Sequence, residues 1–297
     1  MPEGHTIHAL ADRLQRRFGG PPVTVTSPQG RFAEAAALVD GHELLAATSA
    51  GKHLFLEFGR DGEGVDRFVH VHLGLIGSFV VQPQSSLAMD ADGGLAVVGA
   101  VRLRLAADGY VADLRGPNLC QLIDGEEVGR VVAGLGPDPL RHDADPDRAW
   151  RKISRSSRSI AELLMDQSVL AGVGNVYRCE VLFRHRLAPL TPGSRVRPAS
   201  WRTIWADLVE LLPLGVAFGQ ILTMPDQVEE AHRLVGTPEQ IAHMEGLNGE
   251  RLGTWFPREF FVYQRTDQPC RVCGSRIRTQ VVAGRNLFWC ARCQRRR

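Results

Sequence analysis

The amino-acid sequence predicts a multi-domain α+β protein, and three features of the chain support that fold class. Apolar residues near the start fall at helical spacing, the segments after them alternate like short strands, and the second half returns to helical spacing. A tail with four cysteines follows. With 297 residues, the chain is long enough for two domains and a small appended module.

The first expected element is a helix at residues 5–18. A Gly-Gly-Pro-Pro segment at 19–22 ends it, because proline cannot continue a helix and glycine favours turns. The apolar face of this helix consists of Ile7, Leu10, Ala11, Leu14 and Phe18.

Short alternating runs separated by glycine-rich turns follow the helix. This pattern is typical of a β-sandwich or barrel. We therefore expect one N-terminal domain at 1–133, with the helix first and the sheet after it. The expected strands lie at 23–26, 53–58, 68–71, 78–81, 95–105 and 110–113.

Residues 134–147 are rich in Gly, Pro and Asp, and this composition predicts a linker. We expect a helical domain at 148–258 and a small strand-containing module with the cysteines at 259–297. The expected helices lie at 149–153, 159–166, 176–186, 200–218 and 225–234.

The charge is distributed unevenly along the chain. Residues 1–150 contain 13 Lys and Arg against 20 Asp and Glu, whereas residues 151–297 contain 22 against 13. A basic half beside an acidic half predicts a polyanionic partner for the basic one. Arginine dominates, with 33 Arg and two Lys, which suits bidentate phosphate binding and equally fits a bias in genome composition.

Membrane and secreted classes are disfavoured. No apolar run reaches the roughly 18 residues that a membrane span needs. The first twenty residues carry charges throughout and lack the apolar centre of a signal peptide. We expect a cytoplasmic protein.

The cysteines of the tail have the spacing of a zinc site. Two Cys-x2-Cys pairs are separated by sixteen residues, which is a strong pattern for tetrahedral zinc. Disulfides, the alternative, are disfavoured in a cytosolic chain. A site of four thiolates leaves no open position, so we expect structural Zn²⁺ on Cys270, Cys273, Cys290 and Cys293.

A β-hairpin is expected between the two cysteine pairs, with strands at 277–282 and 287–289. Its turn carries Arg285, whose guanidinium can donate two parallel hydrogen bonds to a phosphate. The alternative for Arg285 is a solvated surface side chain.

The chain opens with Met-Pro-Glu-Gly. If Met1 is removed, Pro2 presents a secondary amine, which is a covalent nucleophile for carbonyl-like carbons. Glu3 beside it is a candidate proton donor. A purely structural interpretation also fits, because proline is favoured in the first turn of a helix.

The segment 166–177 lies between two expected helices and contains Gly172, Gly174 and Asn175. The glycines permit tight turns, and Asn175 is suited to cap the second helix. Free N–H groups at that helix start would form an anion pocket. Gly-x-Gly also occurs by chance, and no strand precedes it as a dinucleotide fold would require.

Five motifs occur in order along the chain: MPEG at 1–4, GKH at 51–53, HLGL at 72–75, GVGN at 172–175 and the four-cysteine hairpin. Together they resemble the formamidopyrimidine-DNA glycosylase/endonuclease VIII family of base-excision repair enzymes. The resemblance spans essentially the whole chain and lies closer to the endonuclease VIII-like branch.

This resemblance implies a β-sandwich domain opened by the catalytic helix, then a helix–two-turn–helix domain and a zinc finger, with DNA in the cleft between the domains. It implies a bifunctional DNA glycosylase and abasic-site lyase in which Pro2 attacks C1′ as the nucleophile. Glu3 would be the general acid/base, and Lys52 would contact phosphate near the lesion and assist proton transfer. Asn175 and Arg285 would clamp the phosphates that flank the flipped nucleotide.

The chain departs from the formamidopyrimidine pattern in two loops. Leu75 stands where an apolar wedge would fill the gap left by the flipped base. In the loop 113–119, Arg115 would keep the arginine that faces the orphan base, without an aromatic wedge beside it. These departures favour oxidised pyrimidines as substrates, whereas Glu180 matches the purine-type branch.

Two other functions are weighed against this one. A non-catalytic damaged-DNA-binding zinc-finger protein would not be expected to retain Pro2, Glu3 and Lys52. A zinc-ribbon RNA-binding or translation protein would explain the basic tail but not the proline opening. We expect damaged double-stranded DNA as the partner, no membrane, a monomer, and a cytoplasmic, nucleoid-associated location.

Overall fold

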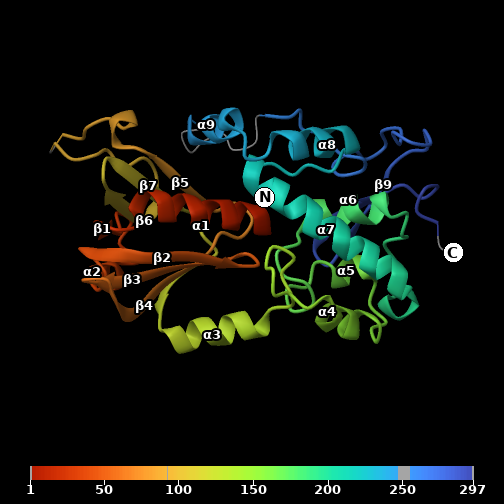
Figure 1. The fold of residues 1–297 in the computed structure, drawn as a ribbon, viewed down its shortest axis with the longest axis horizontal. Helices are drawn as coiled ribbons and strands as arrows, with labels where there is room; N and C mark the ends of the chain where they lie inside the picture. Colours follow the sequence, from red (N-terminus) through yellow and green to blue (C-terminus); the bar gives the residue numbers. More distant parts are fainter. Residues whose placement is uncertain (1, 92, 247–254, 296–297) are drawn as a thin grey trace. The chain divides into compact units, whose positions relative to one another are not determined.

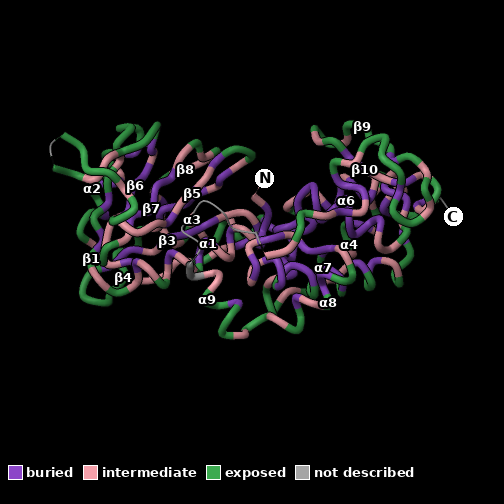
Figure 2. The backbone as a smooth tube through the Cα atoms, turned by 90° about the horizontal axis from the view of Figure 1, so that it is seen from above, coloured by how far each residue is buried: buried purple, intermediate pink, exposed green. Residues whose placement is uncertain are grey.

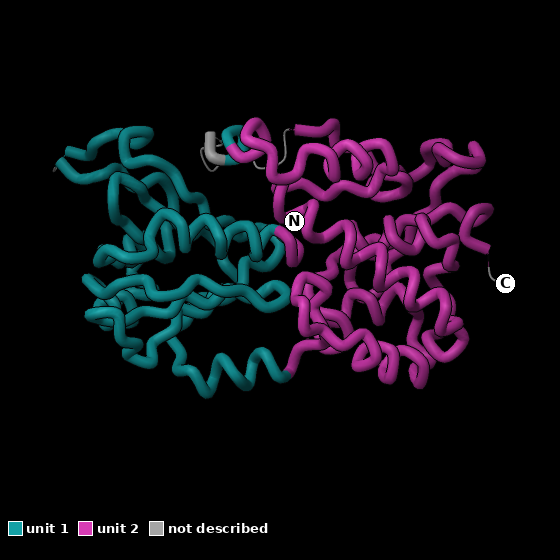
Figure 3. The backbone as a smooth tube through the Cα atoms, viewed as in Figure 1, with its two compact units in different colours: residues 1–2, 6–133, 242–252 teal, residues 3–5, 134–241, 253–297 magenta. Residues whose placement is uncertain are grey.

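Two units of different architecture divide the chain (Figure 3). In the computed structural model, residues 2–91, 93–246 and 255–295 are described. The first unit comprises residues 1–2, 6–133 and 242–252, and the second comprises residues 3–5, 134–241 and 253–297. Among the described residues, no helix is long and apolar enough to cross a membrane.

Helix α1 (Gly4–Phe18) is confirmed within one residue of its expected start. Its apolar face is buried in the core of the first unit, because Ile7, Leu14 and Phe18 are almost fully enclosed. The helix ends where the backbone N–H of Gly19 bonds the carbonyl of Gln15. The glycine and proline run therefore acts as the sequence predicts.

The rest of the first unit is an antiparallel β-sandwich (Figure 1). Strand β1 (Pro22–Thr26) belongs to both layers: residues 22–23 pair with β2, and residues 24–26 pair with β6. Because one strand is shared, the eight strands form one continuous order, β5-β7-β6-β1-β2-β3-β4-β8. Their bounds are β2 (His42–Ala50), β3 (His53–Arg60), β4 (Glu63–His72), β5 (Ser78–Pro83), β6 (Val101–Ala107), β7 (Tyr110–Arg115) and β8 (Leu119–Ile123).

Several elements of this unit differ from the sequence prediction. The strand expected at 95–105 begins only at Val101, and residues 95–100 form a loop. Strands β2 and β8 were missed, and the alanines of β2 give no clear alternation. Three short or exposed helical segments were missed as well: α2 (Ala33–Ala37), η1 (Gln84–Ser86) and α3 (Gly125–Gly134).

The second unit is mostly helical. Helix α6 (Asn175–Arg184) is its centre, since every residue from Asn175 to Phe183 is buried (Figure 2). The other elements are α4 (Pro146–Ile153), α5 (Ile160–Leu163), η2 (Gly193–Arg195), α7 (Pro198–Phe218), α8 (Pro225–Leu234), β9 (Arg278–Val282) and β10 (Arg285–Trp289). Helix α9 (Pro238–Gly246) is divided between the units, because residues from 242 on belong to the first. The segment expected to be helical at 159–166 is helical only in α5.

A buried carboxylate on α6 holds the chain just before the cysteines. Glu180 is fully enclosed and accepts hydrogen bonds from the backbone N–H groups of residues 261–263 at 2.8–2.9 Å. The hydroxyl of Thr223 donates a fourth bond at 3.0 Å. Burial raises the pKa of Glu180, and the four hydrogen bonds oppose that rise. Glu180 therefore has a structural role here, because it binds residues 261–263 to helix α6.

Candidate functional site

The Glu3 carboxylate lies at the N-terminus of helix α6. It is fully buried and accepts hydrogen bonds from the backbone N–H groups of Gly174 and Val176, both at 2.8 Å. These N–H groups belong to the unsatisfied donors of a helix start, and the helix dipole stabilises a negative charge there. The anion pocket expected at Gly172–Asn175 therefore exists, and the anion in it is the chain's own Glu3.

Glycines at two positions make this approach possible. A Cβ on Gly174 would lie 2.3 Å from Cδ of Glu3, so a side chain there would push the carboxylate away. Gly172 adopts a φ of +83°, which glycine tolerates best, and its carbonyl accepts the N–H of Gly4 at 2.8 Å. The sequence predicts the turn correctly but not its partner at the front of the chain.

His5 supplies a third anchor for the first residues. It is 4% exposed, and its ring meets that of Tyr177 edge to face at 5.5 Å between centroids. A Cβ on Gly215 of α7 would lie 3.1 Å from Cβ of His5. Residues 3–5 are thus packed against α6 and α7 of the second unit, directly after Pro2.

Asn175 has a different local role from the one expected. The N-cap of α6 is Gly174, and Asn175 is the first helical residue. Its side chain is buried, accepts a hydrogen bond from Arg178, and donates through Nδ2 to the carbonyl of Asn286 at 2.9 Å. The expectation that Asn175 caps the helix is wrong, because Glu3 occupies the donors that a cap would use.

Arg285 begins strand β10, directly after a two-residue turn. Ala283 and Gly284 both have positive φ values, 52° and 70°, which are typical of a type I′ hairpin turn. The turn therefore ends earlier than the sequence suggested, and Arg285 pairs with Val282 across the strands. Its Nη1 donates to the carbonyl of Gly284 at 3.2 Å.

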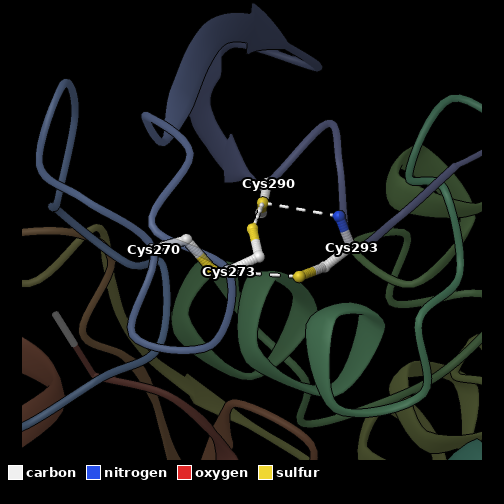
Figure 4. A group of neighbouring side chains, drawn as sticks. All are labelled: Cys270, Cys273, Cys290 and Cys293. Atoms are coloured by element: carbon white, nitrogen blue, oxygen red, sulfur yellow. Dashed lines mark hydrogen bonds between the residues drawn. The ribbon is translucent and has the colours of Figure 1, made fainter.

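The four tail cysteines converge below this hairpin (Figure 4). Their sulfur atoms all lie within 4.8 Å of one another. The pair Cys273–Cys290 is 3.4 Å apart and the pair Cys270–Cys293 is 3.9 Å apart. Four sulfurs at about 2.3 Å from a zinc ion lie about 3.8 Å apart, so this donor set fits tetrahedral Zn²⁺.

Lys52 lies in the tight turn between β2 and β3, where Gly51 has a φ of 58°. Its charge lowers the pKa of two nearby histidines, His53 and His72. Nδ1 of His53 lies 2.8 Å from Nε2 of His70. Burial lowers the pKa of both His53 and His70 to about 4, and burial and the charge of Lys52 lower the pKa of His72. All three imidazoles are therefore neutral at pH 7, which leaves Lys52 as the cation of the cluster.

Leu75 lies in the turn after β4. It is 48% exposed, and its neighbour Ile76 is 88% exposed, so the turn presents two apolar side chains rather than the one noted from the sequence. The turn lies against the loop after β7, because Cβ atoms on Gly74 and Gly77 would meet Asn118 and Gly116 at 2.8 and 3.0 Å.

Arg115 closes β7 in a network that the sequence did not reveal. Its Nη2 pairs with the fully buried Asp113 at 2.8 Å, and its Nε donates to the carbonyl of Val98 at 2.9 Å. Arg104 forms a second, two-armed pair with the same carboxylate at 2.7 and 2.8 Å. Strand alternation places Asp113 on the face of β7 opposite the core residues Ala112 and Leu114, so the sequence gives no sign that its carboxylate is buried.

Three family models match successive parts of this chain. They are the formamidopyrimidine-DNA glycosylase N-terminal domain over residues 1–115, the H2TH domain of that glycosylase over 135–226, and the zinc finger found in FPG and IleRS over 267–296. "Endonuclease 8 1" of Mycobacterium tuberculosis is 47% identical over 99% of this chain and 100% of that protein. The chain belongs to the formamidopyrimidine-DNA glycosylase/endonuclease VIII family.

Solved structures of this family share the fold. MutM (FPG) from Thermus thermophilus is 27% identical, with a TM-score of 0.72 over 99% of this chain and 98% of that one. The Lactococcus lactis Fpg bound to abasic-site DNA is 20% identical, with a TM-score of 0.75 over 99% and 100%. The expected family and fold class are confirmed, including the lean toward endonuclease VIII.

The contact at the start of α6 makes a prediction for Gly174→Ala. The new methyl group would displace the Glu3 carboxylate and leave two buried N–H groups without their acceptor. We expect a loss of about 1–3 kcal/mol in the free energy of unfolding, measured by urea denaturation. Gly129→Ala is the matched control, because Gly129 lies in α3 with open space at its Cβ. Equal stability of Gly174→Ala and the parent would contradict this account of the site.

Proposed function

We propose that this DNA glycosylase of base excision repair is bifunctional, removing oxidised bases and cleaving the resulting abasic sites. The observation that carries the proposal is the anchoring of Glu3 directly after Pro2. A fully buried carboxylate with both oxygens bonded holds the second residue of the chain in a defined place. An N-terminus that served only as a helix start would need no such anchor.

In the proposed reaction, the free amine of Pro2 donates its lone pair to C1′ of the damaged nucleotide. The glycosidic bond breaks, and the base leaves with a proton taken from solvent. The amine then gives up its own proton, the C1′–O4′ bond breaks as O4′ takes up a proton, and an iminium forms between Pro2 and C1′. An N-terminal amine titrates near pH 8, so a useful fraction is unprotonated at neutral pH. The iminium then draws electrons from C2′, whose proton is lost as the 3′ phosphate leaves. A second elimination at the 5′ side completes the cut.

Glu3 is proposed to transfer the proton in this reaction. Its carboxylate is held in place by the two backbone N–H groups of Gly174 and Val176. A carboxylate so fixed is proposed to accept the proton that leaves the amine and to return it to the ring oxygen O4′ as the sugar opens. Because the side chain is fully buried, water does not compete for the carboxylate.

The remaining residues are proposed to grip the nucleic acid. Lys52 and Arg285 each lie at a tight hairpin turn, a place from which a cation can reach phosphate. Asn175 is proposed to join the phosphate clamp beside Arg285 through its tie to Asn286. Leu75 is proposed to insert its side chain into the gap that the flipped base leaves in the stacked bases. Nε and Nη2 of Arg115 already donate hydrogen bonds to Val98 and Asp113. Its proposed contact with the orphan base is therefore made through Nη1.

Damaged duplex DNA is the proposed partner, and oxidised pyrimidines are the proposed bases. The lean toward endonuclease VIII supports the second choice. Solved relatives include Lactococcus lactis Fpg in complex with DNA that contains an abasic site. The protein is proposed to act as a monomer on the nucleoid, with structural Zn²⁺ on its four tail cysteines.

Borohydride trapping on a duplex with one abasic site tests the covalent step. Borohydride reduces an iminium to a stable amine, so we expect a cross-linked adduct with the parent protein. A form that keeps Met1, which lies outside the described residues, has an amide at Pro2 and is expected to give none. Pro2→Gly keeps an amine without the ring and should give far less. Tight binding to abasic DNA without any adduct would contradict the proposed covalent step and would indicate a protein that only recognises damaged DNA.

Zinc removal tests the role proposed for the cysteines. Cys273→Ser leaves three thiolates, so we expect the bound zinc to be lost and the hairpin at 278–289 to become sensitive to protease. DNA binding should weaken at the same time, because Arg285 loses its fixed position. Cys120→Ser is the control, since that thiol lies in β8 of the other unit. One zinc per chain in Cys273→Ser would contradict the assignment.

A further inference from the structure

A small apolar cavity lies between helices α4 and α7 of the second unit, which pack against each other (Figure 1). Its volume is about 190 Å³. Most of its wall consists of three indoles and two prolines, namely Trp150, Trp201, Trp205, Pro146 and Pro198. This tryptophan cavity shares no residue with the sets proposed above for catalysis and for the phosphate clamp.

The three indoles differ in burial. Trp201 is 2% exposed, and its Nε1 donates to the carbonyl of Pro146 at 3.3 Å, which fixes the ring. Trp150 and Trp205 are half-buried, so their rings border both the cavity and the solvent. The rings of Trp201 and Trp205 are 5.9 Å apart and tilted by 51°, so neither ring stacks flat on the other. A third flat ring can therefore contact their faces.

The volume suits one planar ring. In another protein, an apolar cavity of about 150 Å³ is large enough to hold benzene. The tryptophan cavity is somewhat larger, which suits a six-membered ring with its attached oxygen and nitrogen atoms. A pyrimidine base has this size, and nucleobases stack on aromatic side chains because every base has a π face.

Arginines surround the cavity where α7 begins. Arg202 lines it, and Arg195 and Arg197 lie in the segment directly before Pro198. All three arginines are exposed, and within the described part of the chain none of them forms a salt bridge. No side chain caps the start of α7, so the free N–H groups there add to the positive potential.

A second basic segment adjoins the first. The backbone N–H groups of Gly193 and Ser194 donate to the carbonyls of Arg158 and Ser156, both at 2.8 Å. The segment that leads into α7 therefore runs beside the segment that follows α4. Arg155 of that segment is also exposed and, among the described residues, has no carboxylate partner. The positive charges of the two segments thus lie on one stretch of surface.

The charge around the cavity is positive overall. Residues 145–158 and 193–205 contain eight Lys and Arg against two Asp, which is a net charge of +6. Of the two acids, Asp145 pairs with Arg151 at 3.5 Å, and Asp147 lines the cavity. Such a surface complements a polyanion, whereas a neutral or basic peptide would gain nothing from it.

We propose that the tryptophan cavity binds one unpaired base of single-stranded DNA, with the phosphates on either side of that base held by Arg195, Arg197 and Arg202. The volume of the cavity favours a pyrimidine. Base stacking and phosphate contacts are the two interactions that proteins combine to bind single strands. Binding at this cavity requires neither Pro2 nor the phosphate clamp, so it goes beyond the proposed base-excision reaction and does not depend on it.

Binding of an eight-nucleotide oligothymidylate to the full chain, measured by fluorescence anisotropy, tests the stacking. Trp150→Ala and Trp205→Ala should each weaken binding by at least about fivefold, the lower end of what a stacked base contributes. Trp205→Phe keeps an aromatic face and should retain most of the affinity. The control ligand has eight abasic sugar–phosphate units and the same charge. It should bind the parent and the alanine variants equally, which also reports that the variants are folded.

The salt dependence of the same binding tests the phosphate contacts. Each phosphate contact that is lost should lower the slope of log K against log salt by about 0.7 for a single strand. We expect this change for Arg195→Gln and for Arg202→Gln. Arg60→Gln is the matched control, because that arginine is exposed and ends β3 in the other unit, and its slope should equal that of the parent.

A photochemical cross-link locates the bound base. With one 5-iodouracil in the oligomer, we expect the cross-linked peptide to contain Trp150 or Trp205. Cross-links found only outside residues 145–158 and 193–205 would overturn the proposal. Equal affinity of the parent and both alanine variants for the oligothymidylate would overturn it as well. Binding of decaproline at the cavity without binding of the oligothymidylate would instead identify a peptide site and exclude the single strand.

Discussion

The hydrogen bonds between the Glu3 carboxylate and the backbone of Gly174 and Val176 fix the first residues of the chain at the start of helix α6. A buried carboxylate without partners would cost several kcal/mol, so the burial of Glu3 depends on the two N–H groups at the start of α6. The glycine at 174 follows from that requirement, because any side chain there would occupy the volume that Glu3 fills. The position of Pro2 follows in turn, since it is covalently joined to the anchored residue.

Helix α6 collects segments from distant parts of the sequence. Its first turn binds Glu3, its side chain Asn175 binds the hairpin of the tail, and Glu180 binds residues 261–263. This concentration of contacts explains why nearly the whole helix is buried. It also means that the state of the cysteine site and the state of the N-terminus depend on the same ten residues.

Patterns in short stretches of the sequence predicted the elements that depend on neighbouring residues. The helix at the start, most strands, the zinc-type cysteines and the hairpin follow from spacing and turn chemistry, and the joint order of five motifs gave the family. The patterns failed where a partner is remote. Asn175 was expected to cap α6, but a carboxylate 171 residues away in sequence occupies those donors. Helix α3 was missed although Val128, Val131 and Val132 fall at helical spacing, and none of its residues is buried.

The separation between Glu3 and Gly174 has a consequence for synthesis of the protein. Chains emerge from the ribosome N-terminus first, and domains fold as units when their residues become available. Pro2 and Glu3 are among the first residues made, yet their anchor is complete only after Val176 has been added. A truncated product that ends before the start of α6 could still form the β-sandwich core, but its terminal amine would be unanchored. The anchor of Glu3 is therefore completed late, when more than half of the chain already exists.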